Sequence, residues 1–128
     1  MTALTAGSTR GSNVGEVQLR ATFPTVASEK LEEFKALAEK AVVSVRGEAG
    51  ALQYDWFLSD DRTKCVVFEK YASSEAVLAH LANAGGVIGQ LAGLGGGLDL
   101  EVFGDVSPEL RKALAAARPP FYAPFIGL

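Results

Sequence analysis

The feature that most constrains the fold of this chain is a strict alternation of apolar and polar residues in EVQLRATF, residues 16–23. Its apolar members are Val17, Leu19, Ala21 and Phe23. Successive side chains of an extended chain point in opposite directions, so these four share one face. The segment is therefore predicted to be a strand with one buried and one polar face.

The residues after Pro24 have the spacing of an amphipathic helix. Ser28 is a suitable N-cap, and Gly47 is expected to end the helix. Between them runs an apolar stripe about 100° wide, made of Leu31, Phe34, Ala38, Ala41, Val42 and Val45. The first strand is thus expected to lead into a helix that buries one side.

Two more strand-like segments follow, ALQYDWFL (51–58) and KCVVFEKY (64–71), joined by the polar SDDRT. A connection of five residues is typical of a hairpin, so these strands are expected to pair antiparallel. Ser73 or Ser74 can cap a second helix, and GLDLEVFG (97–104) is predicted to be a fourth strand.

The resulting order is β-α-β-β-α-β. It predicts an α+β, ferredoxin-like fold in which two helices cover one face of a four-stranded antiparallel sheet. The length of 128 residues fits one domain. We expect it to span 16–128, with a core at 16–104, a C-terminal extension at 105–128 and a flexible leader at 1–15.

The C-terminal extension has two predicted parts. Ser107-Pro108-Glu109 begins a short helix, because proline is tolerated in the first turn. The prolines of RPPFYAPFIGL prevent a helix in the tail. Its aromatic and aliphatic side chains are expected to pack either on their own subunit or on a partner.

The two faces of the predicted sheet have different compositions. If no strand contains a bulge, the helix-covered face carries Val17, Leu19, Ala21, Phe23, Leu52, Tyr54, Trp56, Leu58, Cys65, Val67, Tyr71, Leu98, Leu100 and Val102. The opposite face mixes charged residues with Phe57, Val66, Phe68 and Phe103. So large an apolar area indicates an interface, and we expect a homodimer that packs sheet against sheet.

Composition excludes several classes of function. The 12 Lys and Arg residues are scattered among 15 acids, without a basic stripe for nucleic acid. No run approaches the roughly 18 apolar residues of a membrane span, and no signal-peptide pattern is present. We therefore expect a cytoplasmic location without membrane association.

The chain has a single cysteine and a single histidine, so neither an internal disulfide nor a metal site made of protein ligands alone is expected. Cys65 is interpreted as inert core.

A glycine-rich stretch, HLANAGGVIGQLAGLGGG at 80–97, holds seven of the chain's 14 glycines. It lacks the spacing of a dinucleotide-binding loop and the lysine of a P-loop. The stretch follows a helix and leads into a strand, so it is predicted to be a loop with a short helical turn around Val87 to Leu91. Such a loop can move and admit a planar substrate beside the sheet.

The segment GALQYDWFLSDDRTKCVVFEKYASSEAVLAHLAN resembles the core of the antibiotic biosynthesis monooxygenase family. The resemblance covers about 16–104. It rests on G-x-x-x-Y at Gly50 and Tyr54, an acidic turn at Asp60 and Asp61, E-x-aromatic at Glu69 and Tyr71, and S-x-E-A with A-H-L between Ser73 and Leu81.

The resemblance implies a dimeric α+β barrel. It also implies oxidation of quinols or polycyclic phenols by O2 without metal, flavin or nicotinamide, so no cofactor is expected. Many members carry a second histidine soon after A-H-L, where this chain reads A-N-A-G-G-V-I-G. Haem degradation, which one branch performs with such a histidine, is therefore disfavoured.

His80 and Glu69 are the candidate catalytic residues. His80 is the only side chain that titrates near neutrality when unperturbed, so it can act as general base; the alternative is a histidine on the helix surface or in a dimer contact. Glu69 is the only acid that strand parity places on the helix-covered face. Burial would raise its pKa into a range useful for proton transfer, unless it is exposed or satisfied by a hydroxyl or basic group.

Four residues are candidates for substrate binding. Tyr54, Trp56 and Tyr71 share the face of Glu69, where they are either core or the walls of an aromatic ligand site. Asn83 can cap the second helix or donate a hydrogen bond into the pocket.

The leading functional hypothesis is cofactor-independent monooxygenation of a quinol or polycyclic phenolic aromatic. The alternative is a non-catalytic dimeric barrel that binds a small hydrophobic molecule or a protein partner.

Overall fold

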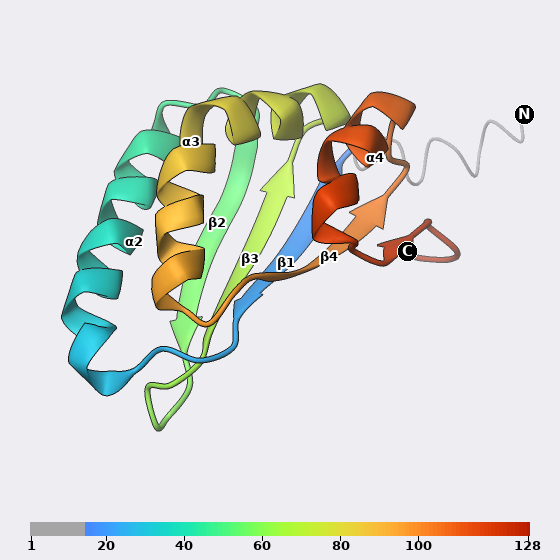
Figure 1. Ribbon diagram of the computed structural model, residues 1–128. Helices are drawn as coiled ribbons and strands as arrows, with labels where there is room; N and C mark the ends of the chain where they lie inside the picture. Colours follow the sequence, from blue (N-terminus) through green and yellow to red (C-terminus); the bar gives the residue numbers. More distant parts are fainter. Residues whose placement is uncertain (1–14) are drawn as a thin grey trace, which may run out of the picture.

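The computed structural model describes residues 15–128 and contains one five-stranded sheet with helices packed on it (Figure 1). Of the expected leader, 1–14 lie outside the described residues. The strands are β1 (Val17–Phe23), β2 (Ala51–Leu58), β3 (Cys65–Tyr71), β4 (Asp99–Gly104) and β5 (Phe121–Tyr122). The helices are α2 (Leu31–Arg46), α3 (Ser74–Leu94) and α4 (Pro108–Leu114), with 3-10 turns η2 (Ser28–Lys30) and η3 (Ala115–Ala117).

The predicted α+β, ferredoxin-like arrangement is confirmed, with one strand more than expected. The strand order is β2-β3-β1-β4-β5. Strand β1 pairs antiparallel with β3 and β4, and β2 pairs antiparallel with β3. The fifth strand comes from the C-terminal extension, where Phe121 and Tyr122 pair in parallel with Val102 and Phe103.

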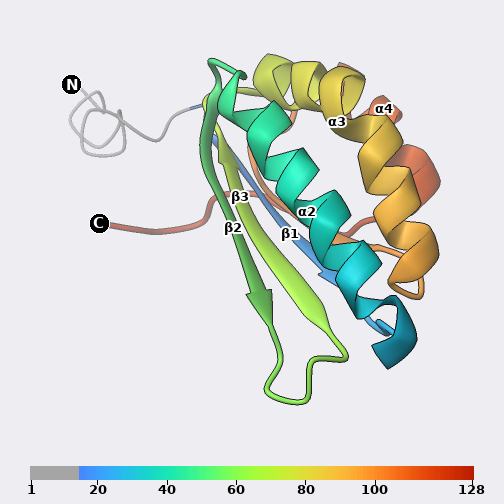
Figure 2. The same cartoon turned by 90° about the vertical axis from the view of Figure 1, so that its left-hand side faces the viewer.

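The helices cover only one face of the sheet, and Figure 2 shows the other face open. Along β1, buried side chains alternate with more exposed ones, as the sequence predicts. Strand β2 departs from the prediction because its register shifts between Ala51 and Gln53. This bulge leaves Leu52 52% exposed instead of buried, and Leu58 at the strand end is 38% exposed.

Serine side chains cap two of the three predicted helix starts. The Oγ atoms of Ser73 and Ser107 accept hydrogen bonds from the backbone N–H groups of Ala76 and Leu110, both at 3.1 Å. The predicted cap at Ser28 is wrong, because that residue begins the 3-10 turn η2, and neither η2 nor α2 has a side-chain cap. Helix α2 ends at Gly47, as expected.

The glycine-rich stretch is mainly helical, which corrects the prediction of a loop. Helix α3 continues to Leu94 because residues seven apart, Val77, Ala84 and Leu91, are all buried along one side. Gly85, Gly86, Gly89 and Gly93 lie on the exposed side, where an added Cβ would meet no atom within 4 Å.

By length and composition, α3 is also the one helix within 15–128 that could cross a membrane. In this structure it packs against the sheet and α2 (Figure 1).

The open face carries the aromatic residues that strand parity assigned to it. Phe57 and Phe68 are 53% and 45% exposed, with ring centroids 5.4 Å apart. Phe103 stacks on Tyr122 of β5 at 5.0 Å. The last residues, including the almost fully exposed Phe125, extend away from the sheet on the side opposite the helices (Figure 2).

Candidate active site

A small cavity of about 50 Å³ lies between the sheet and α3. Its walls are mostly aliphatic and aromatic: Leu19, Ala21, Phe23, Val67, Leu81, Ile88, Leu98, Leu100 and Leu114. Four side chains with polar atoms complete the lining, Tyr54, Trp56, Glu69 and His80. The structure thus brings together four of the six predicted site residues around one apolar space.

His80 comes from α3 and is only 3% exposed. The alternative that it lies on the helix surface is therefore wrong. The rings of Tyr54 and Tyr71 cover it, with centroids at 5.4 and 5.0 Å from the imidazole. A buried histidine must satisfy its ring nitrogens within the protein, which makes its partners informative.

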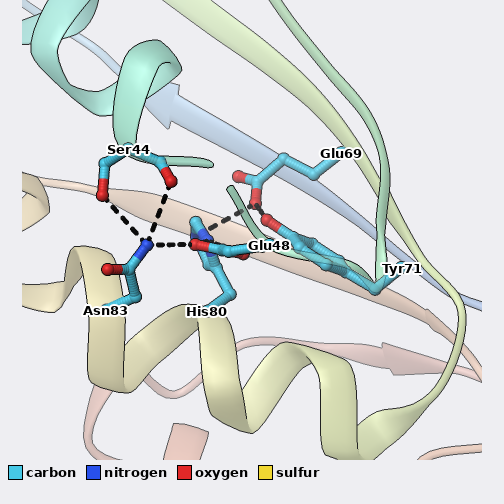
Figure 3. A network of polar contacts seen from close by, with 6 residues as sticks. All are labelled: Ser44, Glu48, Glu69, Tyr71, His80 and Asn83. Atoms are coloured by element: carbon cyan, nitrogen blue, oxygen red, sulfur yellow. Dashed lines mark hydrogen bonds and ion pairs between the residues drawn. The ribbon is translucent and has the colours of Figure 1, made fainter. Parts of the chain in front are cut away.

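The Nδ1 atom of His80 faces the carboxylate of Glu48, at 3.1 Å from Oε1 and 3.2 Å from Oε2 (Figure 3). A carboxylate accepts hydrogen bonds, so Nδ1 carries the proton of the neutral ring. The lone pair of a neutral His80 is consequently on Nε2, the nitrogen nearer Glu69.

Asn83 holds Glu48 in place. Its Nδ2 donates to Glu48 Oε2 at 2.8 Å, to Ser44 Oγ at 2.9 Å and to the Ser44 carbonyl at 3.3 Å (Figure 3). Both predicted roles of Asn83 are wrong, because α3 continues past it and its amide points to α2 instead of the cavity.

Sequence reasoning missed Glu48 and Ser44. Glu48 lies in the short connection after Gly47, where no periodic pattern assigns a direction to a side chain.

Glu69 is 7% exposed, so strand parity correctly placed an acid under the helices. The hydroxyl of Tyr71 donates to its Oε1 at 2.6 Å, and His80 Nε2 lies 3.7 Å from the same oxygen. Burial raises the pKa of Glu69 from 4.5 to about 7, against the lowering effect of the Tyr71 hydrogen bond; the negative charge of Glu48 raises it further.

Burial shifts the pKa of His80 downward, while the charge and the hydrogen bond of Glu48 oppose that shift. Near pH 7 the imidazole is therefore neutral and the adjacent Glu69 carboxyl is close to half protonated. Burial also raises the pKa of Tyr54 and of Tyr71 well above the usual value, which keeps both phenols protonated. The cluster can therefore accept one proton on Nε2, which lies 3.7 Å from the Glu69 carboxyl.

Two buried polar atoms at the cavity have no hydrogen-bond partner among the described residues, the Tyr54 hydroxyl and the Trp56 indole nitrogen. Buried hydroxyl and indole N–H groups usually find partners, because leaving one unpaired costs about 1–3 kcal/mol. Both are available to donate to oxygen atoms of a ligand. Tyr71 differs from its predicted role, since it does not line the cavity and its hydroxyl is engaged by Glu69.

Cys65 is buried, and burial raises its thiol pKa to about 11, which agrees with its interpretation as inert core. Within 15–128, no group of three or more His, Cys, Asp and Glu side chains is arranged to hold a metal ion.

Comparison with known proteins gives one family match. The family model described as antibiotic biosynthesis monooxygenase matches residues 19–85, a span that includes Tyr54, Trp56, Glu69 and His80. A comparison with curated protein sequences gives no significant match.

Several solved structures share the fold. MupZ from Pseudomonas fluorescens is 22% identical, with a TM-score of 0.77 over 90% of this chain and 89% of that chain. Rv0793 from Mycobacterium tuberculosis is 23% identical (TM-score 0.63, 72% and 96% covered). SnoaB from Streptomyces nogalater, described as a cofactor-independent oxygenase, is 16% identical (TM-score 0.61, 70% and 92% covered). The greater coverage by MupZ extends the likeness beyond the part shared with the other two.

Proposed function

The chain belongs to the antibiotic biosynthesis monooxygenase family, and from this premise we propose that it oxidises a quinol or related polycyclic phenol with O2, without an added cofactor. One observation carries the proposal. The buried pair of His80 and Glu69 meets the unpaired donors of Tyr54 and Trp56 at one apolar cavity. Among the solved structures of this fold, SnoaB is described as a cofactor-independent oxygenase.

The first step is removal of a phenolic proton by His80. Its Nε2 carries the free lone pair because Glu48 accepts from Nδ1–H, and the Glu48 carboxylate stabilises the imidazolium that forms. The Tyr54 hydroxyl and the Trp56 N–H donate to the substrate oxygens, where negative charge develops. The phenol becomes an anion, which is the form able to give an electron to O2.

The oxygen chemistry then takes place between the anion and O2 inside the apolar walls. One electron passes to O2, and the aryloxyl radical, whose unpaired electron extends onto a ring carbon, combines with superoxide to form a C–O bond at that carbon. The peroxide takes the proton held on His80. With anthrone as substrate, His80, neutral again, removes the remaining proton from the carbon that bears the hydroperoxide. The O–O bond breaks, and the leaving hydroxide takes that proton from His80 and departs as water. One oxygen atom of O2 becomes the new carbonyl and the other departs as water.

We also propose that the protein acts as a homodimer through the open face of the sheet. This face exposes Phe57 and Phe68 and has no helical cover (Figure 2). An apolar surface of this kind is characteristic of an interface. The apolar C-terminal residues, which extend on the same side, would then lie near the partner copy.

Oxygen uptake tests the proposed reaction. Purified protein is incubated with anthrone and with 1,4-dihydroxynaphthalene in an oxygen electrode, and uptake should exceed the spontaneous rate. His80→Ala should lower this excess by about 100-fold, the usual minimum for loss of a general base, and Glu69→Gln should lower it less. Glu33→Gln, an exposed position on α2, serves as the control. Equal uptake with and without protein would reject the reaction and favour a non-catalytic binding protein.

A further inference from the structure

The cavity beside His80 is too small for the proposed substrates as it stands. Its volume is about 50 Å³, whereas a cavity that accepts benzene has about 150 Å³. A polycyclic phenol therefore needs additional space that connects with the cavity.

An open groove of about 590 Å³ lies next to the cavity, between α2 and the adjacent parts of β2 and β3. This volume is within the range of about 300–1,000 Å³ found for small-molecule sites. Its lining is mainly apolar and includes Phe34, Ala38 and Val42 of α2 with Trp56 and Leu58 of β2. Lys35, Glu39 and Arg46 also line the groove.

Trp56 is the one residue within 15–128 that lines both the groove and the cavity. Aromatic packing holds its ring, which stacks on Phe23 at 5.9 Å and meets Phe34 edge-on at 6.4 Å. Its indole N–H has no partner in the described chain, so rotation of the ring breaks no hydrogen bond. The wall between the two spaces is therefore a side chain that can turn at little polar cost.

We propose that the groove is the outer half of the ligand site, and that Trp56 turns to join it to the cavity beside His80. The ligand is a planar polycyclic aromatic with an oxygen acceptor for the indole N–H. Its oxygen-bearing ring would enter the cavity, and its remaining rings would lie between Trp56 and the apolar side of α2. This inference rests on the proposed function for the class of ligand, but binding can be measured without turnover.

Substitutions that fill the groove test this arrangement. Ala38→Phe and Val42→Phe place a ring in the groove, whereas Ala36→Phe makes the same change at an exposed position of α2 outside it. Binding of 1,4-dihydroxynaphthalene is measured under argon by equilibrium dialysis, after circular dichroism has shown that each variant is folded. The two groove variants should raise Kd by at least about tenfold, since the added ring occupies the space in which the ligand would be buried, and Ala36→Phe should leave Kd within about twofold.

The outcomes separate this inference from the proposed reaction. Weakened binding in a groove variant, without oxygen uptake by the unmodified protein, supports the groove and rejects the reaction. Oxygen uptake together with wild-type Kd values in both folded groove variants overturns the groove as a ligand site. If only one groove variant folds, its Kd decides. Failure of the unmodified protein to bind the probe overturns the inference as well.

Discussion

At the scale of single residues, the site depends on a carboxyl that is buried beside a histidine. Folding raises the pKa of Glu69 from 4.5 to about 7, mainly through burial. The folded protein therefore binds this proton more tightly than the unfolded chain. The resulting contribution to stability is complete below about pH 4.5 and is lost as the pH rises through about 7.

Glu69→Gln should remove this dependence on pH. Between pH 4.5 and pH 8, the free energy of unfolding of the wild type should fall by up to about 3 kcal/mol more than that of the variant. Both proteins retain His80, so the difference isolates the carboxyl. Urea unfolding at several pH values measures it, and parallel curves for the two proteins would show that Glu69 is not buried with a raised pKa.

The alternation of side chains along the strands predicts most of the site residues but not Glu48, which holds His80 through Nδ1. Tyr54 and Trp56 follow the bulge in β2, and Glu69 lies on β3; in these parts of the strands the alternation of side chains fixes their direction. The burial of His80 depends on Glu48 and on the tyrosine rings from β2 and β3. These contacts join segments far apart in the chain, which periodicity cannot predict.

At the scale of elements, α3 departs most from what the sequence predicts. Glycine is a poor helix former, costing about 1 kcal/mol relative to alanine, so seven glycines suggested a loop. The helix persists because Ile88 and Leu91 on its apolar side pack into the core with residues of the sheet, and Ala84 on the same side is also buried. Tertiary packing thus overrides local propensity, and the glycines of the helix itself stay exposed.

Gly89→Ala should stabilise the protein by up to about 1 kcal/mol, because the added Cβ would contact no atom within 4 Å. Gly95→Ala is the matched comparison. There an added Cβ would lie 2.7 Å from the Cβ of Phe23, so this substitution should destabilise the fold. Guanidinium unfolding measures both changes. A loss of stability in Gly89→Ala would show that the second half of α3 is not a regular exposed helix.

At the scale of the whole molecule, the open sheet face requires a partner if its aromatic residues are to be shielded from water. Sedimentation equilibrium at micromolar concentration should report twice the chain mass of 13.4 kDa. Phe68→Lys should shift the species toward the single chain, because it places a charge within the proposed interface. Val43→Lys, at a 65% exposed position on the helical side, should not. A stable 13.4 kDa species for the wild type would contradict the dimer.

His80 can act as the base only if its Nε2 is unprotonated, and Glu48 favours this state because it accepts a hydrogen bond from Nδ1–H. The chain has one histidine, so every imidazole signal in a nitrogen-15 NMR spectrum of the labelled protein belongs to His80. At pH 7 we expect a neutral ring with its proton on Nδ1, and a titration midpoint below the usual pKa of 6.5. A proton on Nε2, or a midpoint at or above 6.5, would contradict the proposed role of His80 as the base.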